Sequence, residues 1–274
     1  MTADTLPRLA PPPAADTGVR TAFLIVDTES VPDGDLLARV KYPDEGLTPD
    51  QAVERAGREQ AETSWNKSDF IPVSFHVPVA ICVVRVGSDF SLQKFTCLGA
   101  PDYHPKRVVR EFWHGVSLEP RAKLVTFNGR GFDLPLLELA AFRYGLSCQS
   151  YLMGSRDRYR GNSLDLCDWF NNYGAVRLSG GLNLLAKILG LPGKMDVDGS
   201  EVYRMHQAGR LREINAYCLC DTLDTYFVFL RSRVLTGDLT AEAEQELVDH
   251  ARDFLEGKLD EVPALRAYLD RWDG

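Results

Sequence analysis

The chain has 274 residues, of which 45% are hydrophobic and 26% are charged, a composition typical of a folded globular protein. Its formal net charge of −8 argues against a histone-like or ribosomal protein, whose affinity for nucleic acid comes from a basic surface. No apolar run approaches the about 18 residues that a membrane helix needs, and no signal-peptide core is found near the N-terminus. The six cysteines form no CxxC pair, so we expect reduced thiols and a soluble, cytoplasmic protein without membrane contact.

The N-terminal part of the chain predicts a tail, a buried strand and a polar insertion. Residues 1–20 hold four prolines among small and polar residues, which predicts a disordered tail. Residues 23–26 are a continuous apolar run, typical of a strand buried on both faces. In the polar insertion that follows, residues 48–51 (Thr-Pro-Asp-Gln) indicate a helix start, because Thr is a good N-cap and Pro suits the first helical turn.

The rest of the chain places further strands before a long helical part. Strands are predicted at 79–86, 92–98 and 123–127. A helix is predicted to begin at Pro105, and further helices are predicted at about 134–146, 164–172, 182–189, 200–208 and 210–235, followed by charged C-terminal helices. Strands that come early and helices that come late predict an α/β fold, in which helices pack over a mixed β-sheet. We expect one folded domain over 21–236 and a helical extension over 237–274.

Asp27 and Glu29 directly follow the first predicted strand. Side chains two residues apart in extended backbone face the same side, so both carboxylates can meet one hard cation. A surface loop at a strand end would also supply acids, so this pair alone leaves both interpretations open.

Two later motifs carry further acids. In Asn128-Gly-Arg-Gly-Phe-Asp133, the glycines allow a tight turn after a strand, and Asp133 begins the next helix, either as a metal ligand or only as its cap. Tyr217 and Asp221 are i and i+4 on a predicted helix and share one face. Taken alone, that pair also suits a helix with one buried tyrosine and one solvated aspartate.

Together the three motifs resemble the DEDD superfamily of 3′–5′ exonucleases in its tyrosine variant. The order is Asp-x-Glu after a first strand, Asn-x4-Asp after a later strand, and Tyr-x3-Asp on a C-terminal helix. Residues 22–235 are similar to the stand-alone predicted exonucleases related to the proofreading domain of family-B DNA polymerases. The histidine variant of the superfamily places His five residues before the last acid, where this chain has Ala216.

The resemblance implies a ribonuclease H-like fold and a site for two divalent cations, Mg²⁺ or Mn²⁺. Oxygen ligands without His or Cys suit these ions rather than zinc. Tyr217 would orient the attacking water. The implied metal ligands are Asp27, Glu29, Asp133 and Asp221, and the predicted substrate-binding residues are Thr28, Asn128, Phe132 and Lys194. For Phe132 a place in the core, and for Lys194 an ordinary exposed position, are the alternatives.

The implied activity is hydrolysis of terminal phosphodiesters at nucleic-acid 3′ ends, mainly of single-stranded DNA, to nucleoside 5′-monophosphates. A 3′–5′ exoribonuclease and a non-catalytic nucleic-acid-binding module are the alternatives. The presence of all four acids and the tyrosine favours an enzyme. Two neighbouring acids are less specific: Asp165 matches the family pattern but also suits a helix cap, and we expect Asp224 to be solvated.

Overall fold

A five-stranded mixed sheet forms the centre of the computed structural model, which describes residues 18–157, 161–194 and 199–272. Its strand order is β3-β2-β1-β4-β5, with β2 antiparallel to β1 and β3, and with β4 parallel to β1 and β5. The strands are β1 (Thr21–Pro32), β2 (His76–Gly87), β3 (Leu92–Cys97), β4 (Lys123–Thr126) and β5 (Ser163–Asp165). The predicted α/β, ribonuclease H-like mixed sheet is therefore confirmed.

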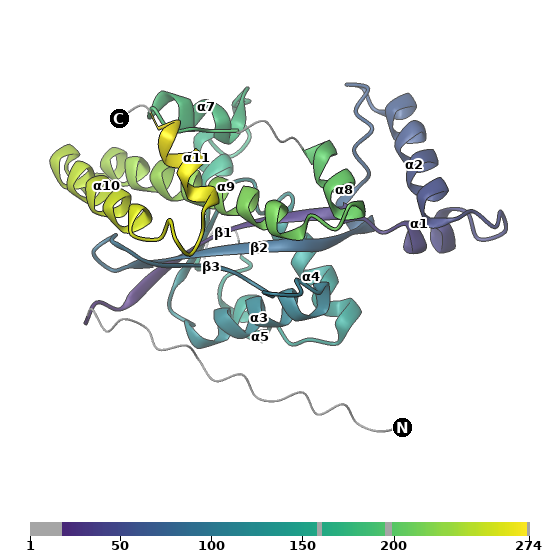
Figure 1. Cartoon of the computed structure of the whole chain (residues 1–274), viewed down its shortest axis with the longest axis horizontal. Coiled ribbons are helices and arrows are strands. Elements are labelled where there is room, and N and C mark those ends of the chain that lie inside the picture. The colour runs from purple at the N-terminus through teal and green to yellow at the C-terminus, as the bar shows by residue number, and fades with distance from the viewer. Residues whose placement is uncertain (1–17, 158–160, 195–198, 273–274) are drawn as a thin grey trace.

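Helices cover both faces of this sheet (Figure 1). One face carries α3 (Pro105–Leu118), α4 (Asp133–Tyr144) and α5 (Gln149–Gly154). The other face carries α7 (Gly181–Ile188), α8 (Gly199–Gln207), α9 (Leu211–Thr236), α10 (Ala241–Glu256) and α11 (Ala264–Asp270). In the described ranges, no helix is long and apolar enough to span a membrane.

The central strand β1 is buried on both faces, as its apolar run predicts. Leu24 and Val26 belong to the core under α3 and α4, whereas Ile25 belongs to the core under α9. Because side chains alternate along a strand, the residues that follow inherit the same alternation. The position of each acid at the end of β1 is thus set by the burial of the run before it.

The polar insertion after β1 forms a small unit of its own, made of α1 (Gly34–Lys41) and α2 (Pro49–Thr63). Its buried residues are Leu37, Tyr42, Ala52, Ala56 and Ile71. The predicted helix start at Thr48 is confirmed as a capping box, in which the backbone N–H of Gln51 donates to the Thr48 hydroxyl oxygen at 3.3 Å. This compact unit holds the segment 64–72, which leads back to the sheet through the 3-10 turn η1 (Val73–Phe75).

One predicted helix is partly wrong, and the predicted tail cannot be compared with the structure. The helix predicted over 164–172 is instead β5 followed by α6 (Leu166–Phe170), because Ser163 and Leu164 pair with β4 and Asp165 then caps the helix. The predicted disordered tail lies, up to residue 17, outside the described residues. The C-terminal helices α10 and α11 pack into the same core as α9 through Ala251, Leu255, Leu265 and Tyr268.

Candidate active site

Three carboxylates from two elements meet on the α9 face of the sheet. Asp27 and Glu29 come from β1 and Asp221 from α9, and one oxygen of each lies within 4.8 Å of the others. The two β1 acids face the same side, as their spacing predicts. Among the described residues, no other group of three metal-ligating side chains is this close together.

Burial makes this group costly to ionise without a cation. It raises the pKa of Asp27 and of Glu29 well above the usual range, and the neighbouring carboxylates raise both pKa values further. Burial also raises the pKa of Asp221 to about 6. A bound divalent cation would remove this mutual repulsion, and hard cations prefer carboxylate oxygen. The residues present therefore suit a Mg²⁺-type ion.

Asp133 lies beside this group rather than within it. It is the first residue of α4, and its buried carboxylate accepts a hydrogen bond of 2.6 Å from the Thr28 hydroxyl. Burial raises the pKa of Asp133 to about 7, and its charge raises the pKa of Asp27. The N-cap position is taken by Phe132, so Asp133 does not cap the helix. Thr28 is buried and holds Asp133 in place.

Asp165 holds the loop that carries Asp133. Its carboxylate accepts the backbone N–H groups of Asn128 at 2.8 Å and Arg130 at 2.9 Å, and it also caps α6. A side chain at Gly129 would place its Cβ 2.3 Å from the Thr126 hydroxyl oxygen, so only glycine fits there. Asp165 is thus both a helix cap and the anchor of the second motif.

Tyr217 stands beside Asp221 on α9, as the i, i+4 spacing predicts. Its buried hydroxyl hydrogen-bonds the Asp221 carboxylate, which lowers the pKa of that acid against the effect of burial. Burial and the negative charge of Asp221 raise the pKa of Tyr217. The phenol therefore stays protonated and can donate a hydrogen bond at neutral pH.

A cavity of about 310 Å³ opens onto the acids. Lys194 lines it, and its positive charge lowers the pKa values of Glu29 and Asp221. Asn128 lines the same cavity. The other lining residues are Asp27, Phe127, Gly180, Gly181, Leu182, Asn183, Asp221 and Asp224. The structure thus brings Lys194 and Asn128 to one hollow with the acids.

Asp224 corrects the sequence-based expectation. We predict a solvated side chain, but Asp224 is only 1% exposed. The Tyr268 hydroxyl of α11 donates to its Oδ1 at 2.7 Å, and its Oδ2 has no hydrogen-bond partner among the residues that the structure describes. Burial raises the pKa of Asp224 to about 7. The cause is the packing of α11 over α9, and the only sequence signal is the position of Asp224 one helical turn after Asp221.

Phe132 lies at the edge of the site rather than in one of the three hydrophobic cores found among the described residues. It is half-buried, and its ring contacts Phe70 and His76, with centroid distances of 5.9 and 6.4 Å. Of the two sequence-based alternatives, the structure thus disfavours a core position.

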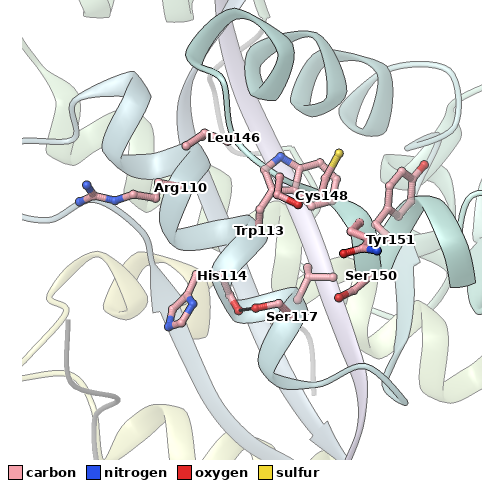
Figure 2. A pocket seen from close by; sticks show the side chains of 11 residues that line it. Arg110, Trp113, His114, Ser117, Leu146, Cys148, Ser150 and Tyr151 are labelled. Atoms are coloured by element: carbon pink, nitrogen blue, oxygen red, sulfur yellow. Dashed lines mark hydrogen bonds between the residues drawn. The ribbon is translucent and has the colours of Figure 1, made fainter. Parts of the chain in front are cut away.

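A second cavity, of about 350 Å³, lies on the opposite face of the sheet. Figure 2 shows Arg110, Trp113, His114 and Ser117 of α3 around it, together with Leu146, Cys148, Ser150 and Tyr151. No acidic side chain lines this cavity. It contains one histidine and one cysteine but no group of metal-ligating residues.

A close group of carboxylates on a mixed α/β sheet is compatible with a hydrolase that uses divalent cations. Residues 68–272 match the family described as a predicted 3′–5′ exonuclease related to the exonuclease domain of PolB, and the chain belongs to this family. Membership in this family makes the chain an exonuclease-type domain. The match includes Asp133, Tyr217 and Asp221, extends through α11, and begins after Asp27 and Glu29. No curated protein matches the chain.

Two solved proteins match parts of the chain at low identity. The family B DNA polymerase of the hyperthermophilic archaeon Pyrobaculum calidifontis is 16% identical with a TM-score of 0.48, over 83% of this chain and 25% of the polymerase chain. E. coli Exonuclease I with a dT13 oligonucleotide is 15% identical with a TM-score of 0.33, over 71% and 42% of the two chains. The same enzyme with a dA16 oligonucleotide is 13% identical with a TM-score of 0.33, over 65% and 40%. The chain thus spans a quarter to about two fifths of these proteins.

Proposed function

We propose that the protein is a two-metal exonuclease that shortens single-stranded DNA from its 3′ end and releases nucleoside 5′-monophosphates. The observation that carries the proposal is the close approach of three half-buried carboxylates, from Asp27, Glu29 and Asp221, two of which line the hollow. Family membership supplies the polarity of hydrolysis. The relation of that family to a DNA polymerase domain favours DNA over RNA.

The four acids would hold the metal ions. Asp27 is the best candidate to bridge two ions, because the charges of all three other acids, Asp133, Asp221 and Glu29, raise its pKa. Two Mg²⁺ or Mn²⁺ ions would activate a water for attack and stabilise the leaving 3′ oxygen. Thr28 supports this arrangement by holding the Asp133 carboxylate.

Other side chains would act on the water and the phosphate. The protonated Tyr217 hydroxyl can orient the attacking water, since it lies beside Asp221 and keeps its proton at neutral pH. Lys194 is an exposed cation that lines the hollow with the acids, so it can contact the scissile phosphate. Asn128, at the start of the motif that ends with Asp133, lines the same hollow and would contact the terminal nucleotide.

The net negative charge of the protein favours a binding site for only a few nucleotides of the substrate. With a net charge of −8, backbone attraction alone cannot hold a long duplex, because non-specific affinity comes from neutralised phosphates. We therefore expect the enzyme to bind a few terminal nucleotides, and to cut a frayed or single-stranded 3′ end faster than a blunt, paired one.

The test follows 5′-labelled oligonucleotides, as single strands and as blunt duplexes, in DNA and in matched RNA. With Mg²⁺ or Mn²⁺ we expect a ladder that shortens from the 3′ end of the DNA single strand, and no cleavage in excess chelator. Full activity in chelator would overturn the metal mechanism. Immediate release of labelled mononucleotide, or cleavage of a circular single strand, would overturn the polarity, and faster cleavage of RNA would assign the ribonuclease alternative.

A further inference from the structure

The segment 64–72, between α2 and the sheet, exposes two large aromatic side chains. Trp65 is 81% exposed and Phe70 is 51% exposed. Single exposed apolar residues are common on protein surfaces and need no explanation. These two differ because each ring contacts a residue from a distant part of the chain at the border of the acidic site.

Phe70 connects the segment to the second motif. Its ring lies 5.9 Å from that of Phe132, the residue immediately before Asp133, and 5.2 Å from that of His76. The His76 ring shares a hydrogen bond of 2.9 Å with the hydroxyl of Ser30, which directly follows Glu29. Phe70 and Phe132 therefore stand next to the end of β1 that carries the acids.

Trp65 connects the same segment to the stretch of chain that leads into the glycines of the hollow. The guanidinium carbon of Arg177 lies 5.5 Å from the centroid of its indole ring. Arg177 precedes the pair Gly180 and Gly181, which line the cavity with Asp27 and Asp221. Lys67, also exposed, lies between Trp65 and Phe70 in the sequence. Aromatic and basic side chains thus alternate along this segment.

The segment is held in shape by its own bonds. The Ser64 hydroxyl donates to the Ser68 carbonyl at 2.9 Å, and the Phe70 N–H donates to the Ser68 hydroxyl oxygen at 3.2 Å. Ile71 is buried in the small core of the insertion. The two aromatic rings are therefore presented on an anchored backbone, which reduces the entropy that binding would cost.

We propose that Trp65, Phe70 and Phe132 form a stacking surface for the unpaired bases next to the 3′ end, an inference that rests on the proposed function. Every base has a π face, so aromatic side chains bind single strands with little sequence preference. Arg177 and Lys67 would neutralise phosphates of the same strand, which the acidic body of the protein does not do. The occupant is an unpaired nucleic-acid strand.

The test measures binding without turnover. In excess chelator, the fluorescence anisotropy of a labelled dT15 strand gives the Kd of the wild type and of the double variant Trp65→Ala, Phe70→Ala. We expect the double variant to bind on the order of 10- to 100-fold more weakly, from the loss of base stacking. In turnover with Mg²⁺ on dT15, the loss should appear mainly in KM.

Phe142→Ala is the matched control. Phe142 is 88% exposed on α4, nine residues after Asp133, and it is not part of the stacking surface. This variant should bind and cleave dT15 as the wild type does. Because all three substituted side chains are exposed, every variant should keep the wild-type melting temperature.

Two outcomes would overturn the stacking surface. The first is a double variant with wild-type Kd for dT15. The second is an equal loss of affinity for a blunt duplex, which would show that the two rings do not act on unpaired bases. The proposed function is tested separately, with wild-type hydrolysis of the p-nitrophenyl ester of thymidine 5′-monophosphate, which has no strand to stack. If the wild-type protein hydrolyses neither that ester nor any strand with Mg²⁺ or Mn²⁺, the proposed function is wrong. The binding measured in chelator still tests the stacking surface in that case.

Discussion

The two faces of the sheet each contain a cavity, of about 310 Å³ on the α9 face and about 350 Å³ on the α3 face. The larger one is lined by Trp113, Tyr151 and mostly uncharged polar groups (Figure 2). The smaller one contains the acids. Size therefore does not distinguish the cavity with the carboxylates from the other one, whereas the kind and the closeness of the side chains do.

The difference originates in the alternation of one strand. Asp27 and Glu29 fall on the α9 face because Ile25 does, and Thr28 falls on the opposite face with Val26. A shift of one residue in the pairing of β1 would move both acids to the wrong face. The burial of β1 on both sides prevents such a shift, so the core of the protein also fixes the position of its chemistry.

The largest effect on cleavage is expected from a substitution that removes one acid from the smaller cavity. Asp27→Asn should reduce single-turnover cleavage of a DNA strand about 10³-fold or more, because several kcal/mol of metal-based stabilisation would be lost. Its melting temperature without metal should not fall, since one buried charge is removed. His114→Ala, in the larger cavity, is the control and should cleave normally. More than a tenth of wild-type activity in Asp27→Asn would assign the chemistry to another place.

A smaller effect is expected from Tyr217→Phe. The substitution keeps the ring and removes only the hydroxyl beside Asp221, so folding and metal binding should be preserved. If the hydroxyl positions the attacking water, the cleavage step should slow roughly 10- to 10³-fold. Single-turnover rates at saturating Mg²⁺ measure this directly. A wild-type rate would make Tyr217 a packing residue.

The smallest effect concerns stability and pH. Burial raises the pKa of Asp224 to about 7, above its ordinary value of 3.8. Between these values the folded protein binds more protons than the unfolded one, so this contribution to stability is complete below pH 4 and is lost as the pH rises through 7.

The substitution Asp224→Asn should reduce the loss of stability that occurs as the pH rises through 7. The amide oxygen can still accept the hydrogen bond from Tyr268, and no charge is buried. Melting temperatures of the metal-free protein at pH 5, 6, 7 and 8 provide the measurement. We expect the variant to melt a few degrees higher than the wild type at pH 8, with the difference shrinking toward pH 5. Parallel curves for the two proteins would contradict the assigned pKa.

Local patterns predict much of this site. The run before Asp27, the two-residue spacing to Glu29 and the helical spacing of Tyr217 and Asp221 each depend on neighbours in sequence, and the structure brings Asp27, Glu29 and Asp221 together. Asp224 could not be placed in this way, because its burial depends on Tyr268, 44 residues later. The same holds for Phe70, whose exposure beside Phe132 depends on how the insertion packs.

The helix α9 packs against β1 although the two elements lie far apart in the sequence. The Cys218 thiol donates a hydrogen bond to the carbonyl of Asp27, 191 residues earlier. A ribosome adds about 5–20 residues per second. Roughly 10–40 s therefore pass between synthesis of the first acids and synthesis of the last one. During that time the nascent chain carries Asp27 and Glu29 without the partner that completes the cation-binding group. The proposed nuclease activity would consequently require that α9 has emerged and docked, because Asp221 completes the acidic group.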